Sequence, residues 1–160
     1  MRLRVLDIHL AGAYVGQLFQ YGDDRNAITR LKPAESFWRD PQAPLLSWAT
    51  VAASPELKEA FWRRYAVTPF FNGQGTTLPA FFQNMLPEGA LRRHVAQERG
   101  CDPDDHFEIL AACGTDLPGA VYAYPAATDA QHTAEIVTQH HDALEVSVVA
   151  QPPAHLEAVD

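Results

Sequence analysis

The residues best suited to bind a metal lie near the C-terminal end of the sequence. His140, His141 and Asp142 follow His132 and Glu135, and all five are of types that ligate transition metals. Their spacing contains neither a histidine pair four residues apart on a helix nor the ligand spacing of a zinc knuckle. We therefore expect no metal site and interpret these residues as a solvated polar segment.

Nucleophiles and phosphate-binding loops are equally weakly indicated. A hydrolase needs a nucleophile beside a base, and no G-x-S-x-G elbow surrounds Ser36, Ser47, Ser54 or Ser147. Cys113 falls on the expected buried side of a helix, where a thiol usually acts as a small inert hydrophobe. Gly73 and Gly75 lack the third glycine and the lysine of a nucleotide loop. We expect a protein that is not an enzyme and that binds no cofactor.

Length and charge restrict the remaining classes of function. The chain has 160 residues, 47% of them hydrophobic, which predicts one folded domain and a tail. A formal charge of -8 repels phosphate backbones, and the basic clusters Arg63-Arg64 and Arg92-Arg93-His94 are short. We therefore expect no direct nucleic-acid binding.

The sequence also indicates a location. No apolar run approaches the length of a membrane span, and the N-terminus lacks the features of a signal peptide. The only cysteines, Cys101 and Cys113, flank a predicted helix and are too distant for easy bridging, which fits a reducing compartment. We expect a cytoplasmic protein that does not contact membranes.

The first third of the chain predicts antiparallel strands. Residues 3–10 and 14–19 alternate around the turn Ala11-Gly12, and residues 27–31 follow a second turn. The run LLSWATV, residues 45–51, is short and apolar and predicts a buried strand, whereas Asn72 to Gly75 reads as a loop.

Helices dominate the rest of the predicted domain. Ser54 and Pro55 begin one to about Tyr65, Thr77 to Pro79 begin a second, a third ends at Gly100, and Asp102 caps a fourth. With a strand over 119–124, we expect an α+β fold, a small curled antiparallel sheet packed by three to four helices. Residues 1–125 form this domain, and 126–160 form a loosely ordered tail with a possible edge strand at 144–149.

Two signatures, FFQNMLPEG and GTDLPGA, predict structural corners rather than an active site. In the first, the phenylalanines anchor a helix, Asn84 bonds a local backbone group and Leu86-Pro87 ends the helix. In the second, Gly114 ends a helix, Asp116 bonds the turn and Gly119 allows close packing at the start of a strand. The residues concerned are Phe81, Phe82, Asn84, Leu86, Pro87, Glu88, Gly89, Gly114, Asp116, Pro118 and Gly119.

The order of these segments resembles a known family. VLDIHLAGAYVGQLF, APLLSWATV, PAFFQNMLPEGALRRHVAQERG and DPDDHFEILAACGTDLPGAVYAYP together resemble the N-terminal subdomain of the HipA family of serine/threonine kinase toxins, over residues 3 to about 125. In that family, a kinase body follows with the phosphate-binding loop and the catalytic and metal-binding aspartates. The sequence contains none of these, so we expect no phosphotransfer by this chain alone.

The resemblance implies partners. In three-part toxin-antitoxin systems of this family, a separate small protein resembles the subdomain, docks on a shortened kinase and neutralises it beside a helix-turn-helix DNA-binding protein. We expect such an antitoxin, which associates with DNA only through the helix-turn-helix partner. The alternative is an N-terminal fragment of a full kinase toxin, which would contribute to docking and to a repressor complex.

An aromatic insertion departs from the family pattern. Relatives have a short connection between LLSWATV and PAFFQNMLPEG, whereas this chain carries Phe61, Trp62, Tyr65, Phe70 and Phe71 there. Aromatic side chains supply much of the binding energy of interfaces, so we expect these residues to contact a partner, with Trp62 partly exposed. Alternatively, the insertion merely covers the sheet.

Overall fold

The computed structural model describes residues 3–22, 26–47, 50–51 and 54–126 of the chain. All of them belong to one compact unit, Met1–Ala127. The predicted tail lies outside the described residues apart from Ala126, and so does its predicted edge strand. The same holds for the histidine-rich segment between residues 132 and 142.

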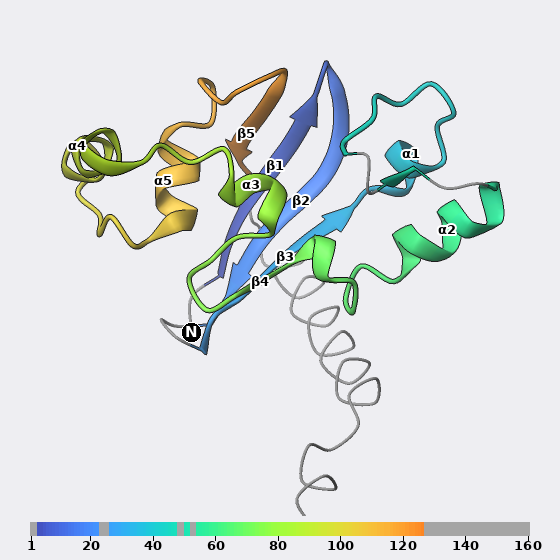
Figure 1. Cartoon of the computed structure of the whole chain (residues 1–160), viewed down its shortest axis with the longest axis horizontal. Coiled ribbons are helices and arrows are strands. Elements are labelled where there is room, and N and C mark those ends of the chain that lie inside the picture. The colour runs from blue at the N-terminus through green and yellow to red at the C-terminus, as the bar shows by residue number, and fades with distance from the viewer. Residues whose placement is uncertain (1–2, 23–25, 48–49, 52–53, 127–160) are drawn as a thin grey trace, which may run out of the picture. The chain divides into compact units, whose positions relative to one another are not determined.

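An open antiparallel sheet organises this unit (Figure 1). Its strands are β1 (Leu3–Leu10), β2 (Ala13–Tyr21), β3 (Ile28–Pro33), β4 (Asn72–Gln74) and β5 (Val121–Pro125). Their order is β4-β3-β2-β1-β5, so that β1 pairs with the strand that follows it and also with the last strand.

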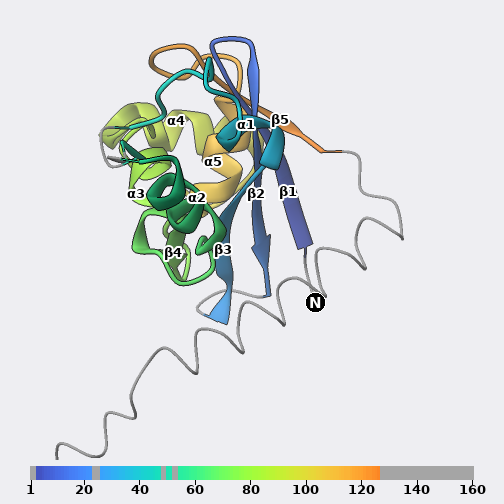
Figure 2. The same cartoon turned by 90° about the vertical axis from the view of Figure 1, so that its right-hand side faces the viewer.

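The helices gather on one face of the sheet (Figure 2). They are α1 (Glu35–Trp38), α2 (Pro55–Arg63), α3 (Ala80–Gln83), α4 (Gly89–Arg99) and α5 (His106–Ala112), with the 3-10 turn η3 (Pro69–Phe71) before β4. The α+β prediction is confirmed, although the described residues hold five α-helices rather than three or four. Among them, no helix is both long enough and apolar enough to cross a bilayer.

The first hairpin forms where the alternating sequence predicts it. Ala11 and Gly12 have φ angles of 49° and 81°, so they form a two-residue turn whose twist suits a hairpin. A bulge then shifts the register between Ile8 and His9. This irregularity sends Val15 into the core and leaves the neighbouring Tyr14 on the opposite face.

Two predictions about the middle of the chain are wrong. The described part of residues 45–51 forms no strand, and Leu45 and Val51 are 50% and 58% exposed. The strand that pairs with the outer edge of β3 is instead β4, whose Asn72 and Gly73 pair with Arg30 and Thr29. Residues 72–74, predicted as a loop, therefore supply that edge strand.

The last helix begins three residues later than predicted. Asp102 Oδ1 accepts a hydrogen bond from the Asp104 backbone N–H at 2.8 Å, which closes a turn instead of capping a helix. Asp105 is the true cap, because its side chain accepts from the backbone N–H of Glu108 at 3.3 Å.

A buried cluster joins the sheet to the helices. The sheet contributes Leu6, Ile8, Val15, Leu18 and Leu31, and the helices contribute Phe37, Trp62, Phe82, Phe107, Ile109 and Leu110. Burial of such side chains is the main stabilising contribution in a domain of this size.

One cation links the first strand to the last helix. Arg4 Nη1 lies 2.9 Å from Asp105 Oδ2 and 3.3 Å from Glu108 Oε1, and Arg4 also donates to Gln20 Oε1. Its guanidinium carbon lies 4.9 Å from the centre of the Phe107 ring. Only 15% of the Arg4 side chain is exposed, so these charges are weakly screened.

We expect Arg4→Met to lower the free energy of unfolding by about 2 kcal/mol, because it leaves the half-buried carboxylate of Asp105 without its cation and leaves Glu108 with Arg99 at 3.3 Å. Arg63→Met is the control, since Arg63 pairs with Glu59 on the surface and its loss should cost less than about 1 kcal/mol. Urea unfolding followed by circular dichroism measures both. Equal losses of unfolding free energy in the two variants would contradict a larger stabilising contribution from Arg4 than from a surface ion pair.

Candidate functional site

Trp62, predicted to be partly exposed, lies in the core of the protein. Its side chain is 3% exposed, and its ring packs at 5.8 Å against Phe37 and at 5.4 Å against Phe71, measured between centroids. The prediction of exposure is wrong because α2 turns this residue toward α1 and η3. In this conformation Trp62 cannot present its ring to a partner.

The rest of the aromatic insertion packs around Trp62. Phe71 is fully buried, whereas Phe61, Tyr65 and Phe70 are half-buried against the same core. Phe61 lies 5.2 Å from Phe71 and 6.0 Å from Phe70 between ring centroids. The insertion therefore extends the core over the sheet, and a partner contact by its half-buried members stays a prediction.

The segment FFQNMLPEG forms the corner between α3 and α4. Phe82 and Leu86 are buried, Phe81 packs edge-on against Phe82, and the Pro87 carbonyl accepts from Arg92 Nε at 2.8 Å. Asn84, Glu88 and Gly89 are exposed. The predicted side-chain bond of Asn84 is not found among the described residues, because Asn84 instead ends α3 through its backbone.

The second signature, GTDLPGA, forms the corner between α5 and β5. Gly114 is the point of close approach, because a Cβ there would lie 2.0 Å from the carbonyl oxygen of Ala123, whose N–H donates to Gly114 O at 2.9 Å. The prediction placed this close packing at Gly119, which instead is exposed and has a φ of 73°. Asp116 and Pro118 are exposed, and the predicted Asp116 side-chain bond is not found in the described part.

A histidine joins the first corner to α5. His106 Nδ1 lies 3.0 Å from Gln83 Oε1, and Arg92 Nη1 lies 3.5 Å from His106 Nε2. Burial, and then the charge of Arg92, lower the pKa of His106. The neutral ring can donate through Nδ1 to Gln83 and accept through Nε2 from Arg92. This packing contact was not predicted, because it joins residues far apart in sequence.

Exposed aromatic side chains lie on the sheet face opposite the core. Tyr14, Tyr122 and Tyr124 are 37%, 41% and 43% exposed, and the rings of Tyr122 and Tyr124 stack within 2° of parallel at 6.2 Å. The His9 ring lies between Tyr14 and Tyr124, and its centroid is 5.3 Å from that of Tyr14 and 5.7 Å from that of Tyr124. We call these four residues the tyrosine face. It was missed because the pairing of β1 with β5 that assembles it is not visible in the sequence.

Asp7 supplies the negative charge beside the tyrosine face. Its Oδ1 accepts from the Tyr14 hydroxyl at 3.0 Å and from Gln17 Nε2 at 3.3 Å. Burial, followed by the charge and hydrogen bond of Asp7, raises the pKa of Tyr14, so its phenol remains protonated at neutral pH. The surface thus offers ring faces, hydroxyls and one carboxylate, which suits recognition of another surface.

Reactive groups are scarce in the described part of the chain. Its residues contain no group of three or more His, Cys, Asp or Glu placed to hold a metal ion. Cys101 and Cys113 are free thiols, and burial raises the pKa of each. Thiols of this kind are poor nucleophiles at neutral pH.

Comparison with known proteins identifies the family of this chain. The family model described as "HipA N-terminal domain" matches residues 6–124. The chain belongs to the HipA N-terminal domain family. The match begins within β1 and ends within β5, so the HipA N-terminal domain includes all four residues of the tyrosine face, which lie on β1, β2 and β5.

Two relatives of this HipA N-terminal domain come from Sinorhizobium fredii (strain NBRC 101917 / NGR234). The one named "Putative kinase Y4dM" is 34% identical over 128 residues, which are 80% of this chain and 28% of that protein. The one named "Putative kinase Y4mE" is 32% identical over 125 residues, or 78% of this chain and 25% of that protein. The chain thus spans about a quarter of the length of each relative.

The names of these relatives contradict one prediction from the sequence. We expected a protein that is not an enzyme, and both relatives carry the name of a kinase. That expectation rested on the motifs of this chain alone, whereas the HipA N-terminal domain occurs within longer proteins with a kinase name.

The two corner glycines should respond differently to alanine. Gly114→Ala forces a Cβ against the Ala123 carbonyl, so we expect a loss near the top of the range of about 1–3 kcal/mol seen for overpacking. Gly119→Ala meets no atom within 4 Å and should cost only the strain of a positive φ, about 1 kcal/mol. Urea unfolding of both variants measures the difference, and a larger loss at Gly119 would contradict the assignment of the close approach.

Proposed function

We propose that this chain acts as the N-terminal domain of a HipA-like serine/threonine kinase and that its tyrosine face docks on the kinase body. The match over residues 6–124 carries the proposal, because the same segment fills only about a quarter of two relatives with a kinase name. In this proposal the remaining three quarters of such a protein supply the kinase body, which is the partner of the HipA N-terminal domain.

The tyrosine face is the surface best suited to that contact. Tyrosine is enriched at the centres of interfaces, where its ring buries apolar area and its hydroxyl forms hydrogen bonds. Tyr122 and Tyr124 lie on β5, an edge strand of the sheet, and the core packs against the other side. Docking here would cover exposed aromatic area without rearranging the core.

The docking can occur within one polypeptide or between two. In the first arrangement the chain is continuous with the kinase body, and in the second it is a separate, antitoxin-like protein that restrains the kinase. Both use the same surface, and we propose that docking neutralises the kinase in either case. Reading the gene beyond codon 160 distinguishes the two arrangements, because only in the first does the reading frame continue into a kinase body.

Association with DNA is proposed to be indirect. The formal charge of -8 opposes direct binding to a phosphate backbone, so a helix-turn-helix DNA-binding partner would supply the DNA contact. Such a complex would form in the cytoplasm, which is where we propose that the protein acts.

The proposed docking can be tested by recovering the kinase with the tagged chain from the source cells. We expect mass spectrometry to identify a HipA-like kinase, attached or separate, and the double variant Tyr122→Ser/Tyr124→Ser to weaken the contact. Removing two exposed aromatic anchors should reduce the affinity by at least roughly tenfold, since one such side chain can contribute 1–2 kcal/mol. If the chain and the kinase body belong to one polypeptide, they are expressed as two separate proteins so that the affinity of the unchanged chain and of the double variant can be compared.

Leu91→Ser on α4 is the matched control, because Leu91 is 60% exposed and lies away from the tyrosine face. The Leu91→Ser variant should bind the kinase with the same affinity as the unchanged chain. Recovery of no HipA-like kinase would contradict the proposed function. Equal binding by the tyrosine variant and the control would contradict the proposed surface.

A further inference from the structure

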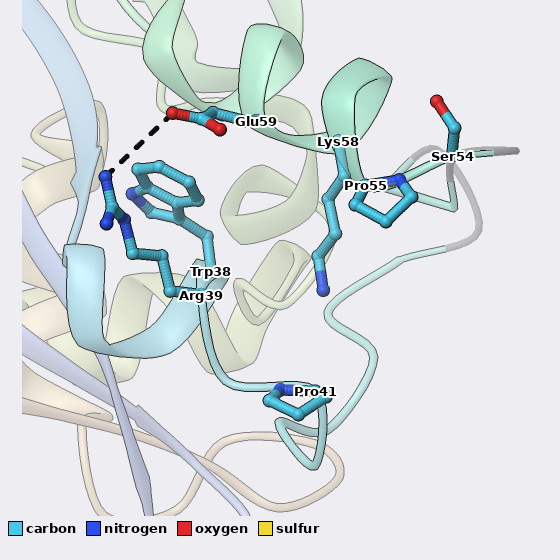
Figure 3. Close-up of a pocket in the computed structure, with 7 residues that line it drawn as sticks. All are labelled: Trp38, Arg39, Pro41, Ser54, Pro55, Lys58 and Glu59. Atoms are coloured by element: carbon cyan, nitrogen blue, oxygen red, sulfur yellow. Dashed lines mark ion pairs between the residues drawn. The ribbon is translucent and has the colours of Figure 1, made fainter.

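A second surface feature lies between α1 and α2. The pocket has a volume of about 590 Å³, within the range of small-ligand sites, and is lined by Trp38, Arg39, Pro41, Ser54, Pro55, Lys58 and Glu59 (Figure 3). Trp38 and the two prolines give it apolar walls. Three of the lining residues are charged, and their pairing decides which ligand the pocket favours.

Lys58 is the unpaired charge in this pocket. Glu59, its neighbour in sequence, is instead held by Arg63 at 2.8 Å and by Arg39 at 3.9 Å. Figure 3 shows the Lys58 side chain extending toward Pro41, away from the ion pair between Arg39 and Glu59. Within the described residues, Lys58 Nζ has no hydrogen-bond or ion-pair partner, although the side chain is half-buried. A half-buried ammonium group in this position favours an anion.

A second donor without a partner lies beside the same pocket. Trp62 Nε1 is buried and has no acceptor among the described residues. Trp62 lines a smaller cavity of about 50 Å³, and Trp38 and Lys58 line both this cavity and the larger pocket. Buried indole N–H groups normally find an acceptor, and a cavity of this size can hold a water molecule or a small acceptor group.

We propose that this pocket binds a carboxylate carried on an apolar stem. The carboxylate pairs with Lys58 Nζ, and its second oxygen, directly or through one water, accepts from Trp62 Nε1. The stem lies against Trp38, Pro41 and Pro55. A carboxylate suits the site better than a phosphate dianion, because a single free cation and one N–H match one charge and two oxygens. Binding of a carboxylate in this pocket does not require the kinase partner.

Titration of the full ¹⁵N-labelled chain with phenylacetate, followed by nuclear magnetic resonance, tests the proposal. The indole N–H signals of the three tryptophans are separate from the backbone signals. We expect saturable shifts of the Trp62 and Trp38 indole signals, with a Kd in the roughly millimolar range for a ligand of this size. Phenylacetamide, which has the same shape without the charge, should bind about tenfold more weakly.

The chain provides a matched control, because Lys32 is its only other lysine. We expect Lys58→Met to weaken phenylacetate binding by about tenfold while retaining the dispersed spectrum of the folded chain, and Lys32→Met to leave binding unchanged. Equal shifts by phenylacetamide or inorganic phosphate, unchanged binding by Lys58→Met, or no saturation up to tens of millimolar would each overturn the proposal.

Discussion

The pairing of β1 with β5 is the constraint on which the rest of the structure depends. Leu6 to Leu10 pair with Pro125 to Val121, so the last strand of the domain lies beside the first. The helices between them in sequence pack on one face of the sheet that this pairing completes. Arg4 strengthens the same closure, because it binds Asp105 and Glu108 on the helix that precedes β5. Pairing of such distant strands has a cost in chain entropy, which the buried core offsets.

The same pairing gives the two faces of the sheet different side chains. Ile8 and Ala123, which face each other across β1 and β5, enter the core. The alternate pairs, Asp7 with Tyr124 and His9 with Tyr122, lie on the other face. The bulge in the first hairpin adds Tyr14 to that face while Val15 remains in the core. The proposed docking surface is therefore a consequence of the sheet that holds the domain together.

Local sequence signals predicted the elements more successfully than their contacts. The Ser54-Pro55 start of α2 and the alternation of β1 and β2 are local features, and both elements form as predicted. The described part of the apolar run at 45–51 forms no strand, and residues 72–74 pair with β3 instead, a choice of partner that local hydrophobicity cannot reveal. The prediction that Trp62 is partly exposed is wrong for a similar reason, since Phe37 and Phe71, which bury its ring, come from other elements.

We propose above all that the tyrosine face contacts a kinase body. Hydroxyl-radical footprinting of the free chain and of its complex with the kinase body tests this contact most directly. We expect Tyr122 and Tyr124 to become protected from oxidation in the complex, while the exposed Leu91 remains as reactive as before. Unchanged oxidation of both tyrosines, with protection at another surface of the domain, would contradict the proposed contact.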